Sequence, residues 1–120
     1  MIGKKLWVFA DGDLPPHPEN LGEPKAHEAL MVVNNSSKEA IIKVTLLFED
    51  KEPKDDLQLR VAPKRVHCFR LDQKVWDQDY TIPNGQYALM LESNVPVVAV
   101  FGRLDRRKDV AYYAVAPYSE

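Results

Sequence analysis

The chain has 120 residues with a net charge of −2, of which 45% are hydrophobic and 28% charged. This is the size of one domain, expected over residues 1–120, with a core that needs no disulfide or metal for stability. Its acidic balance argues against a dedicated nucleic-acid binder, because such binding depends on neutralising phosphates. With one cysteine, no secretory leader and no long apolar run, we expect a cytoplasmic protein.

Short segments with β-branched and alternating apolar residues predict strands along most of the chain. The first strand is expected at 5–10. Residues 11–25 are predicted to be irregular, because their prolines fit neither a helix nor a central strand. Strands are expected at 26–33 and 39–49, separated by the turn 34–37. In the latter strand the even positions are apolar and should face the core: Ala40, Ile42, Val44, Leu46 and Phe48.

The second half continues the same pattern. The charged segment 52–56 is predicted to be a turn, residues 72–85 a long loop, and Ser93-Asn94 a turn between two strands. Further strands are expected at 57–61, 65–71, 86–92, 96–103 and 111–118. Eight short strands with no convincing helix predict an all-β fold, an antiparallel eight-stranded sandwich or barrel.

The residue types that usually carry catalysis do not form a recognisable set. The three histidines lie on separate segments without a ligand spacing, so we predict no metal site and no cofactor. Cys68 follows His67, but neighbouring strand residues point to opposite faces, which predicts a buried, unreactive cysteine. The chain has neither a Gly-x-Ser-x-Gly turn nor a glycine-rich phosphate loop, so we do not expect an enzyme.

Glu28 is an unusual residue in its predicted strand, because it shares a face with Leu30 and Val32. A carboxylate among apolar side chains is costly unless it is paired or hydrogen-bonded. Two interpretations remain open. Glu28 either reaches solvent at the end of the strand or meets an arginine, for which the chain offers Arg65, Arg70 and Arg103.

The segment from Ser93 to Asp105 combines an apolar strand with two opposite charges, Arg103 and Asp105, at its end. It predicts a buried strand that brings both charges to one end of a β structure. The following basic run, residues 103–109, is the best candidate contact for a phosphate or an acidic partner. Asp50 lies in a charged run typical of a solvated turn, and Trp7 either packs in the core or stacks on a sugar or base.

Five pieces of the sequence, in this order, resemble the sensory rhodopsin transducer family, small soluble partners of a microbial sensory rhodopsin. The resemblance covers essentially the whole chain, and Asp-Lys-Glu-Pro and Ser-Asn-Val-Pro are its most specific strings. One departure is Ala26, where the transducer has a serine before the His-Glu pair. The pieces are residues 7–15, His27-Glu28, Asp50-Lys51-Glu52-Pro53, Arg65 with Arg70, and Ser93 to Asp105 with Arg107.

The resemblance implies a jelly-roll β-sandwich assembled as a cyclic homotetramer, with a signalling or binding role rather than catalysis. The leading interpretation is a module that binds a small, sugar-like ligand and works with a membrane receptor. The alternatives are a protein-interaction adaptor without a ligand and a DNA-binding regulator, which the acidic net charge disfavours. The ligand-site residues that the resemblance implies are Trp7, His27, Glu28, Asp50, Arg65, Arg103 and Asp105.

Overall fold

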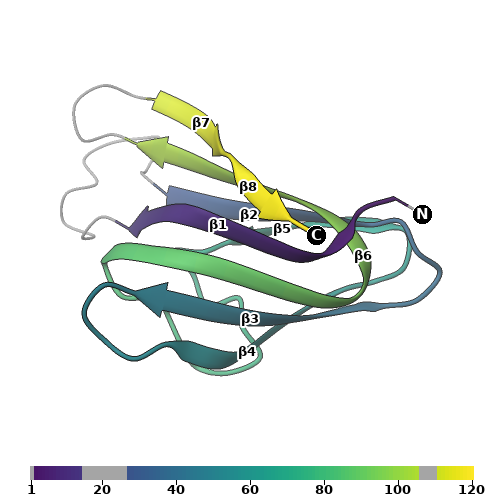
Figure 1. Ribbon diagram of the computed structural model, residues 1–120, viewed down its shortest axis with the longest axis horizontal. Helices are drawn as coiled ribbons and strands as arrows, with labels where there is room; N and C mark the ends of the chain where they lie inside the picture. Colours follow the sequence, from purple (N-terminus) through teal and green to yellow (C-terminus); the bar gives the residue numbers. More distant parts are fainter. Residues whose placement is uncertain (1, 15–26, 106–110) are drawn as a thin grey trace.

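The computed structural model describes residues 2–14, 27–105 and 111–120, and it consists of two antiparallel sheets packed face to face (Figure 1). The first sheet has the order β4 (Lys54–Val61), β3 (Ala40–Phe48), β6 (Gly85–Asp105), β1 (Lys4–Leu14) and β8 (Pro117–Ser119). The second sheet contains β5 (Arg65–Arg70), β2 (His27–Asn34), the C-terminal half of β6, and β7 (Ala111–Val115). The predicted all-β class and eight-stranded antiparallel sandwich are confirmed.

β6 joins the two sheets, and this corrects the prediction of two strands separated by a turn. It is one strand of 21 residues, whose first half pairs with β1 and β3 and whose second half pairs with β2 and β7. Pairing with β3 ends at Ser93, and pairing with β2 begins at Val98. Pro96 lies in this crossing, where the ladder does not need its missing N–H group.

The described residues form eight strands, the number predicted, but their boundaries differ from those predicted. The expected strand 111–118 is two strands, because Pro117 turns away from the second sheet and pairs with Phe9 in the first. β1 also extends through Asp11–Leu14, which was predicted to be irregular, because Gly12 and Leu14 continue the ladder opposite Tyr87 and Gly85. β4 likewise begins at Lys54 rather than at residue 57. Only the first part of the predicted loop 11–25 is described.

The core lies between the sheets and is lined by the alternate residues that the sequence pattern predicted. Ile42, Val44 and Leu46 of β3 are fully buried, which confirms the predicted inward face of that strand. Aromatic rings connect the sheets, since Phe9 stacks on Phe101 with ring centroids 5.7 Å apart. Each buried side chain of this size contributes roughly 1.5–3 kcal/mol, so the core supplies the main stabilisation of the sandwich.

The outer faces of the two sheets differ in chemistry. On the first sheet Lys43 lies opposite Gln58 on one side and Glu92 on the other, so polar and charged groups alternate with apolar ones. On the second sheet apolar residues oppose each other across three strands, and Val66 is 65% exposed. This apolar outer face comprises Met31, Val33, Val66, Cys68, Val98 and Val100.

Cys68 is exposed on the apolar outer face, so the prediction of a buried cysteine was wrong. Its strand alternates as expected, with Phe69 facing the core, but β5 is the edge strand of the second sheet and nothing described covers its outer side. The side of Cys68 was therefore predictable from the sequence, whereas the exposure of that side was not.

Candidate functional site

Glu28 and Arg103 meet at the end of the sandwich where β1 and β6 end and where β2 and β7 begin (Figure 1). The two residues are paired in the β2–β6 ladder, and both side chains point between the sheets. Arg103 Nε lies 2.7 Å from Glu28 Oε2, and the side chains are only 7% and 2% exposed. Of the three arginines considered for Glu28, the structure therefore selects Arg103.

Both carboxylate oxygens of Glu28 have partners. Oε2 also accepts a hydrogen bond of 2.8 Å from the backbone N–H of Asp13, and Oε1 accepts one of 2.5 Å from the Tyr87 hydroxyl. These partners come from β1 and from the first half of β6, so the carboxylate ties the two sheets together. A buried charge with these partners avoids most of the penalty that an unpaired charge would have.

The guanidinium of Arg103 connects the buried pair to the surface. Nη1 lies 3.1 Å from Asp11 Oδ1, and Nη2 donates to the carbonyl oxygen of Asp13 at 3.4 Å. The Tyr113 ring covers the guanidinium at 5.5 Å. Asp11 has a side chain that is 51% exposed and Tyr113 is 39% exposed, so both belong to the rim. We call Asp11, Asp13, Glu28, Tyr87, Arg103 and Tyr113 the Glu28–Arg103 network.

Burial shapes the titration of this network. It raises the pKa of the Glu28 carboxyl, while the hydrogen bonds from Tyr87 and the Asp13 amide and the charge of Arg103 act in the opposite direction. Burial also raises the pKa of Tyr87 well above its ordinary value, and the neighbouring Glu28 adds to the shift. Tyr87 therefore keeps its proton and serves as a donor to the carboxylate.

Gly12 allows the close approach of β1 to the network. A Cβ atom at this position would lie 2.5 Å from the Tyr87 ring, so a larger residue would displace the ring that binds Glu28. The sequence interpretation did not select Gly12, Asp13 or Tyr87 as site residues. A signal existed for the first two, because Asp11-Gly12-Asp13 lies in the string that carries the family resemblance.

The other predicted site residues lie apart from the Glu28–Arg103 pair. Trp7 is in the core, where its indole donates to the carbonyl oxygen of Val97 at 3.1 Å, so it fills the core-packing role considered for it. Asp50 is exposed and lies 3.0 Å from Lys51. Arg65 is exposed and pairs with Asn34, roughly 20 Å along β2 from Glu28.

Two predicted residues adjoin the network in sequence. His27 is half-buried and lies opposite Leu104 in the β2–β6 ladder. As the neighbour of Glu28 in a strand, it directs its side chain to the other face of the sheet. Asp105 is the last residue of β6 and pairs with Ala111 through the backbone, but its side chain lies outside the described part of the chain. Ala26, Arg107 and the rest of the basic run, residues 106–109, also lie outside the described residues, as does His17, one of the three histidines considered as metal ligands.

The described residues contain neither a group of metal-binding side chains nor a helix suited to span a membrane. Within 2–14, 27–105 and 111–120, no three His, Cys, Asp or Glu side chains come together in a way that could bind a metal ion. In the same part of the chain, no helix has the length and apolar character that a membrane span requires.

The comparisons with known proteins agree with this architecture. A family model described as Anabaena sensory rhodopsin transducer matches residues 2–119. A crystal structure of Thermotoga maritima 1070 is 33% identical with a TM-score of 0.84, over 100% of this chain and 97% of the other. The Anabaena sensory rhodopsin transducer itself is 32% identical with a TM-score of 0.75, over 88% of this chain and 92% of the other.

No curated protein matches the chain, so the assignment depends on the family model and the solved structures. The family match covers nearly all residues, and both structures share the fold at more than 30% identity. The resemblance predicted from the short strings of the sequence is thereby confirmed. This chain belongs to the Anabaena sensory rhodopsin transducer family.

Proposed function

We propose that this protein is a non-enzymatic, cytoplasmic signalling module that binds a small, sugar-like ligand at the rim of the Glu28–Arg103 network. Ligand binding would change how the protein meets a receptor partner in the membrane. This proposal draws on the name of its Anabaena relative, which describes that protein as a sensory rhodopsin transducer. Such a change is limited by the difference in ligand affinity between the two states of the module.

The observation that carries this proposal is the buried Glu28–Arg103 pair, whose guanidinium also contacts the exposed Asp11. A buried ion pair contributes little net stability compared with a well-packed apolar pair, so its presence suggests a role beyond folding. At the rim, Asp11 offers acceptor oxygens, and Tyr113 offers an aromatic ring that is 39% exposed. Acceptor oxygens can bind the hydroxyl groups of a sugar, and an aromatic ring can pack against the flat face of its ring.

The proposed site uses part of the predicted residue set. His27, Glu28, Arg103 and Asp105 lie in or beside the network in sequence, and Asp11 and Tyr113 are added to them. Contacts of a ligand with Trp7, Asp50 and Arg65 stay predictions, because these residues lie elsewhere in the chain described.

We also propose that the protein works as a homotetramer, with the apolar outer face as an interface between copies. Val66, Val100 and Val33 on this face are 65%, 45% and 41% exposed. Exposed apolar surface of this kind marks contact sites. Apolar surface is buried favourably against apolar surface of another copy, and a contact repeated around a ring closes a cyclic assembly. Tyr112 and Gly102 continue this face along the second sheet, on the side opposite to the Arg103 and Tyr113 side chains.

A thermal-shift screen of neutral sugars, sugar acids and nucleosides tests the ligand proposal. A ligand at 100 times its dissociation constant should stabilise the wild-type protein by about 2.7 kcal/mol. In Asp11→Asn and Tyr113→Ala, the ligand that stabilises the wild type most should no longer raise the melting temperature. Asp79→Asn is the control, because it changes a more exposed acid outside the network that pairs with Lys74 on the surface, and this variant should keep the response.

Two outcomes would contradict the proposal. If the hit stabilises Asp11→Asn and Tyr113→Ala as strongly as the wild type, its site lies elsewhere. If no compound gives a shift, the adaptor without a small ligand becomes the better interpretation of the network.

A further inference from the structure

A separate cavity of about 270 Å³ lies at the other end of the sandwich from Glu28 and Arg103. Its walls come from three parts of the chain: Lys5 of β1, residues 36–38 in the turn between β2 and β3, and residues 94–96 of β6 where that strand crosses between the sheets. Nothing in the proposed function uses these residues.

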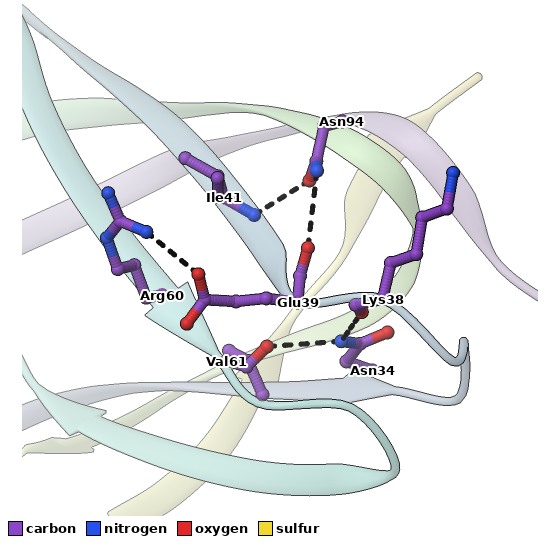
Figure 2. Close-up of polar contacts among 7 residues, drawn as sticks. All are labelled: Asn34, Lys38, Glu39, Ile41, Arg60, Val61 and Asn94. Carbon is purple, nitrogen blue, oxygen red and sulfur yellow. Dashed lines mark hydrogen bonds and ion pairs between the residues drawn. The ribbon is translucent and has the colours of Figure 1, made fainter.

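Two asparagine side chains hydrogen-bond to the backbone around the segments that line this cavity (Figure 2). Asn34 is fully buried, and its amide donates to the carbonyl oxygens of Lys38 at 2.8 Å and Val61 at 3.1 Å. Asn94 accepts a hydrogen bond from the Ile41 N–H at 2.7 Å and donates to the Glu39 carbonyl oxygen at 3.2 Å. The cavity walls are therefore held in place before any ligand arrives, which lowers the entropic cost of binding.

The cavity carries positive charge. In the part of the chain that the structure describes, no carboxylate lies within ion-pair distance of the Lys5 or Lys38 ammonium group. The acid next to Lys38 in sequence, Glu39, is engaged with Arg60 at 2.8 Å, and Figure 2 shows its side chain directed away from that of Lys38. The two ammonium groups are thus available to an anion.

The remaining walls combine polar and apolar groups. Ser37 adds an exposed hydroxyl beside Lys38, while Val95 and Pro96 are half-buried apolar residues. Ammonium groups bind phosphate as point charges, and a phosphate monoester has close to two negative charges at neutral pH. The volume lies just below the range of about 300–1,000 Å³ typical of pockets for drug-sized molecules, so the ligand must be small.

We propose that this cavity binds a small phosphate monoester, with the phosphate between Lys5 and Lys38 and the carbon skeleton against Val95 and Pro96. Two lysines match the double charge of the phosphate, whereas a single carboxylate would leave one ammonium group unmatched. The apolar wall favours an ester over inorganic phosphate. This site is independent of the rim of the Glu28–Arg103 network.

Glycerol 3-phosphate, titrated into ¹⁵N-labelled full-length protein, is the probe. We expect its binding to shift the amide signals of residues 36–38, Asn94 and Val95. Lys5→Ala and Lys38→Ala should each weaken binding about tenfold, the effect of losing one hydrogen bond to a charged group. Lys43→Ala removes an exposed lysine of β3 outside the cavity and should bind as the wild type does.

Glycerol and inorganic phosphate complete the test. Glycerol should give no shifts, and inorganic phosphate should bind more weakly than the ester. The proposal is overturned if no amide shifts at low salt, if the shifts map to other residues, or if Lys43→Ala weakens binding as much as Lys38→Ala. Equal affinity for inorganic phosphate and the ester would overturn the assignment of a monoester. Asp11→Asn should leave this binding unchanged, which separates it from the proposed sugar site.

Discussion

At the scale of single residues, the burial of Glu28 and Arg103 carries a large desolvation penalty. The pair is tolerated because Tyr87, the Asp13 amide and Asp11 complete its hydrogen bonding. Removing one member would leave a buried charge without its partner, which costs far more than the pair itself contributes. Residues that position a ligand at the rim must therefore be tested separately from residues that support the fold.

Arg103→Ala is expected to lower the free energy of unfolding by about 3–5 kcal/mol, because Glu28 loses its charged partner in a site where its side chain is 2% exposed. Urea denaturation followed by fluorescence measures this loss. Arg60→Ala is the matched control, since its pair with Glu39 is about half exposed and should be worth about 0–1 kcal/mol. Similar losses for both variants would contradict a buried role for Arg103.

The raised pKa of Glu28 predicts a direction for the pH dependence of stability. The folded protein binds this proton more tightly than the unfolded chain does. The stability from this group is therefore fully present below about 4.5, its ordinary pKa, and is lost as the pH rises through the folded pKa. The free energy of unfolding of the wild type minus that of Glu28→Gln should fall over that range. A difference that rises with pH would show that the pKa is lowered.

At the scale of elements, the buried side-chain amide of Asn34 connects strands that are separated in the sequence. Asn34 ends β2, and its side chain bonds to the turn before β3 and to the end of β4. β6 makes the larger connection, because one strand supplies a member to both sheets. These links explain how a short chain without a described helix holds its two sheets together.

Asn34→Ala is expected to lower the free energy of unfolding by about 1–3 kcal/mol, because buried carbonyl oxygens lose their donor. Asn34→Asp should cost at least as much, since an ionised carboxylate cannot donate to those carbonyls. Chemical denaturation measures both losses. Asn84→Ala, at an exposed loop position, should stay close to the wild type. An unchanged stability of Asn34→Ala would show that the turn does not depend on this amide.

At the scale of the whole molecule, the sandwich has one mixed outer face and one apolar outer face. The difference is not required by the fold, since both sheets have equivalent inner faces. Exposure of Val66, Val100 and Val33 to water would be unfavourable in an isolated chain, and each Å² removed from water is worth roughly 25 cal/mol. The same face continues to Tyr112, which is next in sequence to Tyr113 of the proposed ligand site.

Val66→Glu is expected to break the assembly, because it places a charge on the apolar outer face at its most exposed valine. Size-exclusion chromatography with light scattering should find the wild type well above the 13.7 kDa of one chain and the variant close to it. Ile41→Glu makes the same change on the outer face of the first sheet, where Ile41 lies opposite Arg60, and should keep the assembly. A wild-type protein that runs as a monomer contradicts the tetramer.

Several features of the fold followed from local patterns alone. The period of two in β3 predicted which residues are buried, and the position of Glu28 in line with Leu30 and Val32 predicted its inward direction. Side-chain direction in a strand depends on the backbone of that strand, so neighbouring residues carry the information. The family was also evident from short strings spread along the chain.

Other features depended on contacts between distant segments. Arg65, Arg70 and Arg103 were equivalent partners for Glu28 until the β2–β6 register placed Arg103 opposite it. The continuity of β6 through Ser93 and Asn94 arises from pairing with four other strands, and the exposure of Cys68 from the lack of a described cover on its sheet. Strand alternation is a property of one segment, whereas register and coverage belong to the packed molecule, and for that reason only the tertiary structure decided them.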